Sequence, residues 1–481
     1  MKPRYAFALA LFLGLATLLR AAGPEPPDTP QGARMKALLA AFAAGTPDAV
    51  RAFITANFAP SALQQMPLEQ RVQRLSGIVA QTGPLEYHSI LRPSETEPVY
   101  LVRSRDGWME LGMMLDASAG YGVQGLRFDE SEGPGAVQEA RMGSDAEAAA
   151  AADALLQKLS ASGDFSGVVL MAKDGKPFFQ QAYGLADRGL GVPNRPDTKF
   201  NLGSINKIFT QTAIAQLAEK GKLSFTDTIR RHLPEYPLPA ADRITIQQLV
   251  SMTSGLGDFF GEKFNATPKA QIRTLEDYLR LFATDPLLYE PGTSRRYSNA
   301  GYIVLGLIIE KVSGQSYYDY VRENIYGPAG MTSSDSYLQD AVVPNRATGY
   351  TSEDENEKRL SEPRTNIYEL PGRGSSAGGG YSTAQDLLRF DVAMRAGKLL
   401  SPAWTAWFYS DRTAPPSGPQ PAASKPPKLS GGRGAAGGTS GVNAVLEMDL
   451  DTGYTVVVLS NLDPPSAEKV SKTLRQFLGL R

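Results

Sequence analysis

Two β-hairpin signals at opposite ends of a long segment constrain the fold of this chain more than any other feature. The strand-like segments are residues 167–172 and 178–184 around the turn 173–176, and residues 442–448 and 454–460 around the turn 451–453. An amphipathic helix follows the second hairpin, with apolar residues at Val470, Leu474, Phe477 and Leu478. Strands at both ends with helices between them predict a mixed α+β fold, in which the two hairpins join into one antiparallel sheet packed against helices.

A separate domain is predicted over residues 30–131. Its first helix has apolar residues at Met35, Leu38, Leu39 and Phe42, Thr46-Pro47 starts a second helix, and Leu68, Val72 and Leu75 mark a third. Four strand-like segments follow at residues 85–91, 99–104, 108–115 and 122–128. This order of helices and strands resembles the small, cone-shaped α+β fold of ketosteroid-isomerase-like domains. The segment contains no evident acid/base pair, so we interpret it as an accessory domain that packs or guides substrate.

The ends and connections of these domains have their own signals. Residues 1–22 have a basic start, an apolar core and small residues at the end, which predicts a signal peptide and hence a periplasmic or secreted protein. Arg20 makes the cleavage site irregular, so an uncleaved anchor stays an alternative. No membrane span is expected after cleavage. Residues 132–148 are predicted to be a linker, residues 149–481 the larger domain, and residues 413–428 a surface loop rich in Pro, Ser and Ala.

Scarce residues exclude several kinds of chemistry. The chain has no cysteine, which excludes thiol catalysis, thiolate zinc sites and disulfides. Its two histidines, His88 and His232, have no nucleophile nearby in sequence, and we interpret both as structural. With 49 basic and 50 acidic residues, the net charge of −1 does not favour nucleic acid as a partner. No metal site, nucleotide motif or cofactor signal is present, so a small-molecule or peptide substrate is expected.

A Ser-x-x-Lys pattern opens a strongly helical segment at Ser204. A serine in the first turn lies near free backbone N–H groups, and Lys207 is its neighbour three residues later. A lysine can accept a proton only when it is neutral, which burial permits. The pattern alone is weak, because Ser466-Ala467-Glu468-Lys469 also matches it and reads as an ordinary helix start. A phenol and an amide at Tyr297-Ser298-Asn299, expected on one side of an extended loop, could move a proton and hold a substrate amide.

From about Phe165 to its end, the chain resembles the class C β-lactamase and penicillin-binding-protein-related serine hydrolases. The matching stretches include residues 198–207, 221–224, 253–256, 297–302, 377–379, 383–386 and 452–461. The resemblance implies a β-lactamase-like antiparallel sheet with flanking helices and an all-α subdomain. It also implies acyl transfer, with Ser204 as nucleophile, Lys207 and Tyr297 moving protons, and Asn299, Gly437 and Gly438 binding substrate. The oxyanion would be held by the backbone N–H groups of Ser204 and Gly438.

The third motif of that family departs from its pattern. A Lys or His stands two residues before the glycine in the family, whereas this chain has Ala435-Ala436-Gly437. Arg433 could replace the missing cation or be a solvated loop arginine, and Met252 replaces a family histidine, which we interpret as a packing change. Two hypotheses follow. The first is an exported serine hydrolase that cleaves an ester, an amide or a D-amino-acid peptide bond, as an esterase, a peptidase or a weak β-lactamase. The second is a non-catalytic protein that binds peptides or peptidoglycan on the same scaffold.

Overall fold

The structure, a computed structural model, divides into two compact units, residues 1–139 and 140–481. It describes residues 24–480 apart from 106, 118–119, 132, 134–141, 354–358, 411–414 and 417–429. The predicted signal peptide, most of the predicted linker and most of the predicted loop at 413–428 therefore lie outside the described residues. The predicted linker reached residue 148, but helix α6 already begins at Asp145 and packs Ala148 into the second unit.

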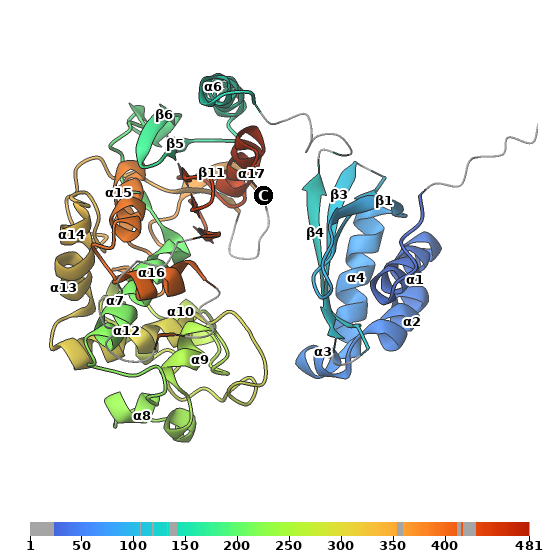
Figure 1. The fold of residues 1–481 in the computed structure, drawn as a ribbon, viewed down its shortest axis with the longest axis horizontal. Helices are drawn as coiled ribbons and strands as arrows, with labels where there is room; N and C mark the ends of the chain where they lie inside the picture. Colours follow the sequence, from blue (N-terminus) through green and yellow to red (C-terminus); the bar gives the residue numbers. More distant parts are fainter. Residues whose placement is uncertain are drawn as a thin grey trace, which may run out of the picture. The chain divides into compact units, whose positions relative to one another are not determined.

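The first unit places helices before strands, as predicted (Figure 1). Its helices are α1 (Pro30–Ala44), α2 (Pro47–Asn57), α3 (Pro60–Gln65) and α4 (Leu68–Thr82). Its antiparallel sheet has the order β1 (Glu86–Arg92), β2 (Val99–Arg103), β3 (Trp108–Asp116) and β4 (Gly122–Ser131). Thr46 caps α2 by accepting a hydrogen bond from the N–H of Ala49, as its sequence predicts. Helix α3 was not predicted, since six residues carry little periodicity.

The two terminal hairpins of the second unit join into one five-stranded antiparallel sheet, which confirms the predicted fold. Its order is β13 (Gly432–Thr439), β14 (Val442–Asp449), β15 (Tyr454–Ser460), β5 (Gly167–Lys173) and β6 (Lys176–Tyr183). The join is a full ladder between β15 and β5, in which Val457 pairs with Leu170. Short strand pairs lie outside this sheet: β7 (Leu185–Asp187) with β8 (Val192–Pro193), β9 (Phe200–Asn201) with β12 (Tyr381–Ser382), and β10 (Tyr350–Glu353) with β11 (Arg359–Thr365).

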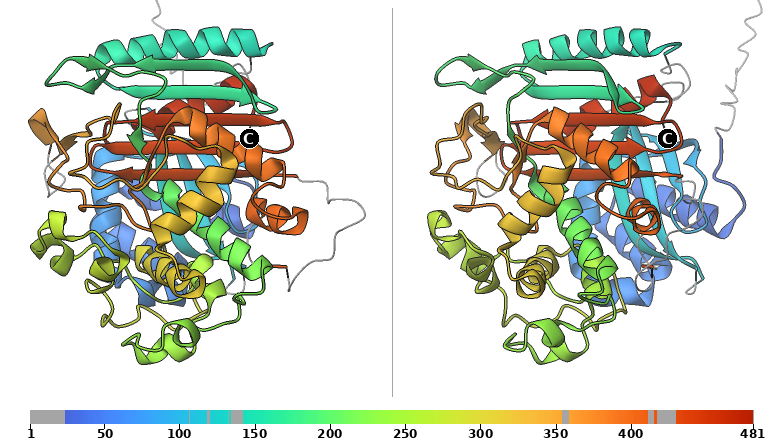
Figure 2. Two further views of the ribbon diagram at one scale, coloured as in Figure 1. Left: turned by 90° about the vertical axis from the view of Figure 1, so that its left-hand side faces the viewer. Right: turned by 60° about the vertical axis from the view of Figure 1, so that its left-hand side comes forward.

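Alternating side chains of the sheet face two separate cores. Val168 and Leu170 of β5 belong to the larger core, whereas Val169 and Met171 belong to a core shared with α6 (Asp145–Ser162) and α17 (Ser466–Leu478). Figure 2 shows α15 (Ala384–Arg395) lying across the opposite face. Because both faces are covered, the central strands are apolar throughout rather than alternating.

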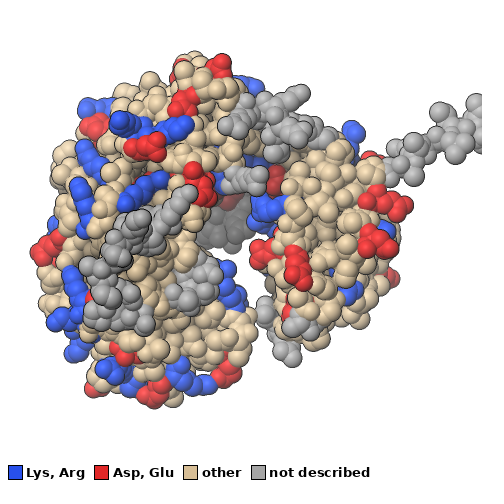
Figure 3. Space-filling model, viewed as in Figure 1, with Lys and Arg blue, Asp and Glu red and all other residues tan. Residues whose placement is uncertain are grey.

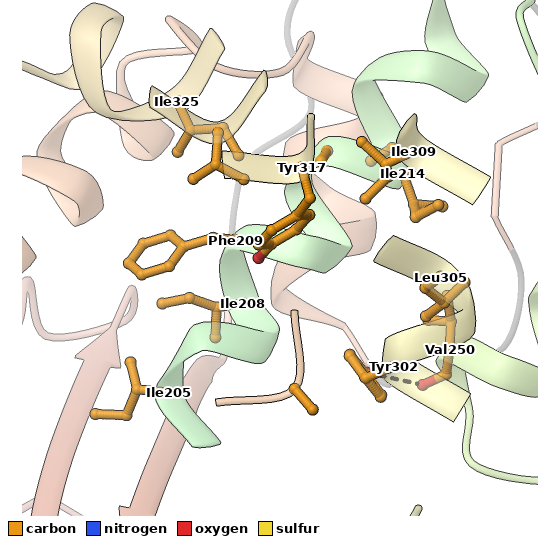
Figure 4. Close-up of a cluster of buried hydrophobic side chains, with 14 of the residues drawn as sticks. Ile205, Ile208, Phe209, Ile214, Val250, Tyr302, Leu305, Ile309, Tyr317 and Ile325 are labelled. Carbon is orange, nitrogen blue, oxygen red and sulfur yellow. Dashed lines mark hydrogen bonds between the residues drawn. The ribbon is translucent and has the colours of Figure 1, made fainter. Parts of the chain in front are cut away.

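The larger core surrounds α7 (Lys207–Glu219), whose residues from Lys207 to Ala218 are all buried. Figure 4 shows Ile208, Phe209 and Ile214 of this helix packed among residues of α12 (Asn299–Ser313) and α13 (Tyr317–Val321). Among the described residues, the remaining α-helices of the unit are α8 (Ile229–His232), α9 (Ile246–Val250), α10 (Glu262–Ala266), α11 (Leu275–Leu279), α14 (Gly327–Ala329) and α16 (Pro402–Tyr409). Burial on every side holds α7 in one position, so the residues at its start are held by the core as well.

The face of the molecule in Figure 3 carries basic and acidic side chains intermixed. This agrees with the near-zero net charge of the sequence. Among the residues that the structure describes, no helix combines the length and apolar character that crossing a membrane requires.

Candidate active site

Ser204 lies in a single 3-10 turn, Gly203–Asn206, which leads directly into α7 at Lys207. The sequence predicted the first turn of an α-helix here, whereas the structure has a tighter 3-10 turn that begins at Gly203, whose φ of 48° is left-handed. Ser204 is partly exposed, while Asn206 and Lys207 beside it are buried. The hydroxyl of Ser204 therefore stands at the surface of the site with a buried amine behind it.

Lys207 makes three hydrogen bonds at the bottom of the site. Its Nζ lies 3.1 Å from Ser204 Oγ, 2.7 Å from Asn299 Oδ1 and 2.5 Å from the carbonyl oxygen of Ala377. The same nitrogen stands 4.8 Å from the ring centre of Tyr297. A neutral amine can donate to the amide and carbonyl oxygens, and it then has its lone pair free to accept from the Ser204 hydroxyl.

Burial also changes the protonation of Lys207. The loss of solvation lowers its pKa to about 7, and the negative charge of Asp258 opposes this change in part. A pKa near neutrality makes the neutral amine, which is the state that a base requires, accessible at ordinary pH.

Tyr297 completes the contacts around the serine, because its hydroxyl donates to Ser204 Oγ at 2.6 Å. The residue as a whole is 51% exposed, yet the surroundings of the hydroxyl remove enough water to raise the pKa of Tyr297 to about 12. The phenol is therefore neutral at ordinary pH and acts as a donor. The sequence placed Tyr297 and Asn299 in an extended loop. In the structure Ser298 is extended and is the N-cap of α12, and Asn299 is already the first residue of that helix.

Two groups at the site were missed in the sequence. Asp258 Oδ2 accepts a hydrogen bond of 2.7 Å from Asn299 Nδ2, which fixes the amide so that its oxygen faces Lys207. The other group is the carbonyl of Ala377, within a stretch that matched the family without an assigned role. Asp258 stands two residues after the matching stretch 253–256. Its place beside that stretch was the feature of the sequence from which a role at the site could have been predicted.

The start of the 3-10 turn and strand β13 touch through glycines. A Cβ on Gly437 would lie 2.5 Å from the backbone nitrogen of Ser204 and would also strike the carbonyl of Leu202. A Cβ on Gly203 would lie 2.8 Å from the backbone nitrogen of Gly438. Only glycine permits this approach, which places the backbone N–H groups of Ser204 and Gly438 at neighbouring positions.

A cleft of about 470 Å³ opens over Ser204. One wall is the β13 segment Ala436–Thr439, and another is apolar, with Phe259, Phe260 and Tyr278. Asn299, Gly437 and Gly438 line it together with Ser204 and Tyr297, so every predicted site residue except the buried Lys207 borders the same space.

The missing third-motif cation is not replaced by Arg433. Both expectations for Arg433 are wrong, since it is buried, donates to the carbonyl of Phe408 at 2.9 Å and to Gln211, and stacks 3.8 Å from the Phe408 ring centre. Ala435 packs against the larger core. Among the described residues that border the cleft there is no lysine, arginine or histidine. Met252 also packs against that core, in agreement with its interpretation as a packing change.

The other candidates from the sequence have structural partners. His232 bonds to Asp227 at 2.9 Å, and His88 packs edge-on against Trp108 at a ring-centre distance of 5.1 Å. Ser466 starts α17, and its hydroxyl bonds to Ser460 Oγ at 2.9 Å, with Lys469 exposed. Within the described ranges, no three acidic or histidine side chains converge in a way that could hold a metal ion.

Comparison with known proteins agrees with this geometry. A family model described as "Beta-lactamase" matches residues 152–480, which leaves the first unit outside the match. Penicillin-binding protein 4* of Bacillus subtilis (strain 168) is 32% identical over 261 residues, which span 52% of this chain and 56% of that protein. The chain therefore matches only a little over half the length of this curated relative.

Two solved structures share the fold. The penicillin binding protein from Bacillus halodurans superposes with a TM-score of 0.57 and 30% identity, over 66% of this chain and 98% of that chain. The D-amino acid amidase from Ochrobactrum anthropi SV3 superposes with a TM-score of 0.56 and 22% identity, over 69% and 97%. The match of the family model to most of the chain, and that of the Bacillus halodurans protein over nearly its full length, show that this chain belongs to the Beta-lactamase family as a serine hydrolase of the β-lactamase-related kind.

Proposed function

We propose that this protein is an exported hydrolase that cleaves ester, amide or D-amino-acid peptide bonds through an acyl-enzyme on Ser204. The observation that carries the proposal is the hydrogen-bonded group around Ser204 Oγ, with Lys207 Nζ at 3.1 Å and Tyr297 Oη at 2.6 Å. A serine hydroxyl becomes a nucleophile when an adjacent base removes its proton. Lys207, whose pKa is lowered to about 7, has that capacity.

In the first step, Ser204 Oγ forms a bond to the substrate carbonyl carbon as its proton passes to Lys207 Nζ. The carbonyl π electrons move to oxygen, and the N–H groups of Ser204 and Gly438 bind this oxyanion. Collapse of the intermediate breaks the bond to the leaving group, which takes a proton from Tyr297, and Tyr297 regains one from Lys207. The products of this half-reaction are the acyl-enzyme and a neutral alcohol or amine.

Water then completes the reaction. The water gives a proton to the neutral Lys207, or to the Tyr297–Lys207 pair, as its oxygen bonds to the acyl carbon. The bond between this carbon and Ser204 Oγ then breaks, and the same groups return the proton to Ser204. Asp258 holds the Asn299 amide, and Asn299 in turn holds Lys207, so the base keeps its position through both half-reactions.

The substrate classes rest on the cleft and on the relatives. The apolar wall of Phe259, Phe260 and Tyr278 suits a hydrophobic acyl group. One relative is named for penicillin binding and a solved structure for D-amino acid amidase activity, and amides are among the proposed substrates. The missing cation argues against efficient binding of a substrate carboxylate, and hence against strong β-lactam turnover.

Export is part of the proposal because residues 1–22 have the composition of a signal peptide. Expression of the full chain with a C-terminal tag, followed by fractionation and N-terminal sequencing of the mature protein, tests it. A protein that keeps Met1 and stays in the cytoplasm would contradict export.

A fluorophosphonate probe tests the chemistry. We expect one adduct on the intact protein, its loss in Ser204→Ala, and its retention in Ser466→Ala, where the second Ser-x-x-Lys pattern is removed. Absence of an adduct on the wild-type protein would favour the alternative, a non-catalytic peptide- or peptidoglycan-binding protein, for which the missing cation is the only supporting observation.

A further inference from the structure

A carboxylate on α17 borders the same cleft as Ser204. Glu468 lies in the first turn of α17 and lines the cleft together with Gly438 and Thr439 of β13. The residue is partly buried, and its Oε2 atom is shielded from solvent. Within the described part of the chain, this oxygen has no hydrogen-bond partner. A shielded carboxylate oxygen without a partner is unfavourable unless a ligand supplies one.

The position of Glu468 is fixed relative to the oxyanion strand. Asn443, which pairs with Gly438 in the β13–β14 ladder, accepts a hydrogen bond of 2.5 Å from the backbone N–H of Ala467. The loop before α17 also touches this strand, since a Cβ on Gly438 would lie 2.6 Å from Pro464 Cγ. The first turn of α17 is therefore tied to the strand that the proposed reaction uses.

The charge of Glu468 is not balanced by its neighbours in the cleft. The other carboxylate that lines it, Glu369, is paired with Arg364 at 2.5 Å. The described lining contains no basic side chain, and the Lys207 amine below it is engaged by Ser204, Asn299 and Ala377. A substrate therefore meets one unpaired negative charge in a cleft that is otherwise apolar or neutral.

We infer that Glu468 is a specificity-determining residue that selects substrates carrying a positively charged nitrogen, such as a quaternary ammonium or a protonated amine. The inference rests on the proposed function, since it concerns the same cleft. In the third family motif a cation recognises a substrate carboxylate, so the inferred charge selection is the opposite of the family's. In this chain Ala435 stands in place of that cation, and Glu468 contributes a negative charge beside the same strand. Charge pairs in a partly desolvated site are stronger than in water, so one carboxylate can decide between otherwise identical substrates.

Two isosteric pairs of esters test this selection. In one pair the charge is on the alcohol, as in phenylacetate esters of 2-(trimethylammonio)ethanol and of 3,3-dimethylbutanol. In the other it is on the acyl group, as in methyl esters of 4-(trimethylammonio)butanoate and of 5,5-dimethylhexanoate. We expect a preference in kcat/KM for the cation of about tenfold in at least one pair, equal to about 1.4 kcal/mol. The pair that responds also tells on which side of the scissile bond the cation binds.

Variants connect the preference to Glu468. The cationic-to-neutral ratio should fall to near one in Glu468→Gln, invert in Glu468→Lys, and be partly kept in Glu468→Asp. In the matched control Glu369→Gln, which removes a carboxylate already paired with Arg364, the ratio should change by less than about twofold. If Glu468 only stabilised the start of α17, its substitution would lower Tm and leave the ratio unchanged.

Binding to Ser204→Ala separates failure of this inference from failure of the proposed function. Calorimetry with the same four esters measures charge selection without catalysis. A preference for the cation in Kd that Glu468→Gln removes supports the inference even if the wild-type protein forms no acyl-enzyme. Equal Kd and kcat/KM values for charged and neutral members in both pairs, or ratios unchanged in Glu468→Gln, would overturn it while the fluorophosphonate adduct on Ser204 still stood.

Discussion

The amine of Lys207 and the amide oxygen of Asn299 lie 2.7 Å apart, although 92 positions separate the two residues in the chain. In this contact and in that to the Ala377 carbonyl, a neutral amine uses both of its hydrogens as donors. Its lone pair then points toward the hydroxyl of Ser204. The arrangement explains how one buried nitrogen can serve as a base, and its consequences can be measured.

The rate of acylation should depend on the protonation of Lys207. Since burial lowers its pKa to about 7, kcat/KM for a neutral ester should rise about tenfold per pH unit below this value and level off above it. The direction follows because only the deprotonated amine accepts the serine proton. A pH–rate profile checks this, and Lys207→Ala should lose at least about 10² in kcat/KM. An acidic limb that persisted in Lys207→Ala would assign the titration to another group.

The same pKa change predicts a pH-dependent stability. Between the folded-state value of about 7 and the ordinary value of 10.5, the unfolded chain binds a proton on Lys207 that the folded chain lacks. Stability therefore rises with pH across this window, by about 1.4 kcal/mol per unit relative to Lys207→Met. Urea unfolding of both proteins at several pH values measures the difference. Parallel stability curves would mean that the folded protein keeps this lysine charged.

Tyr297→Phe should impair substrates according to their leaving groups. The phenol stays neutral because burial raises the pKa of Tyr297 to about 12, so it can donate to a departing oxygen or nitrogen. An amide, whose leaving amine needs that proton, should lose about 10²–10³ in kcat/KM. A p-nitrophenyl ester of the same acyl group should lose much less, since its leaving group departs as an anion. Equal losses for both substrates would contradict a role in protonating the leaving group.

Gly437→Ala should remove most activity without unfolding the protein. The added Cβ would lie 2.5 Å from the backbone nitrogen of Ser204, so the strand must move away and the oxyanion would lose a donor. Loss of one such donor costs about 10²–10³ in kcat. Gly434→Ala on the same strand is the control, because there the Cβ meets only the mobile end of Glu447, with Oε2 at 2.6 Å. Similar activities of the two variants would exclude the proposed oxyanion site.

Asp258→Asn should shift the pH profile to lower pH. The negative charge of Asp258 raises the pKa of Lys207 against the stronger effect of burial, so its removal lowers that pKa further. The acidic limb of kcat/KM should therefore move below its wild-type position. An unchanged limb combined with a lower plateau would mean that Asp258 acts only by positioning Asn299.

Local sequence patterns predicted much of the fold. Strand-like runs on either side of turn residues predicted β5, β6, β14 and β15. Their position at both ends of the domain predicted that they share one sheet, which the ladder between Val457 and Leu170 confirms. The short helix α3 and the exact start of α12 were not predicted, because a few residues carry too little periodicity. The ketosteroid-isomerase-like character of the first unit and the export of the protein stay predictions.

Arg433 and Glu468 show why the electrostatics of the cleft could not be predicted. In the sequence the first was a possible replacement for the missing cation, and the second was part of an ordinary helix start. Folding buries Arg433 against Phe408 and places Glu468 at the edge of the cleft. Which charge faces a substrate depends on the packing of strands and helices far apart in the chain, and periodicity does not contain that information.

By itself the sequence determined which residues could carry the chemistry. It contains no cysteine, and its two histidines have no nucleophile nearby in sequence. A serine and a lysine three positions apart at a helix start were therefore the candidates. Only the tertiary structure decided that this lysine, and not Lys469, is buried beside its serine. Both follow a serine at the same spacing, but Lys207 is enclosed by α12 and the 377–379 segment, whereas Lys469 stays in water. The physical reason is that an ammonium gives up its proton near neutral pH only where burial removes its solvation, and burial is a property of the packed chain.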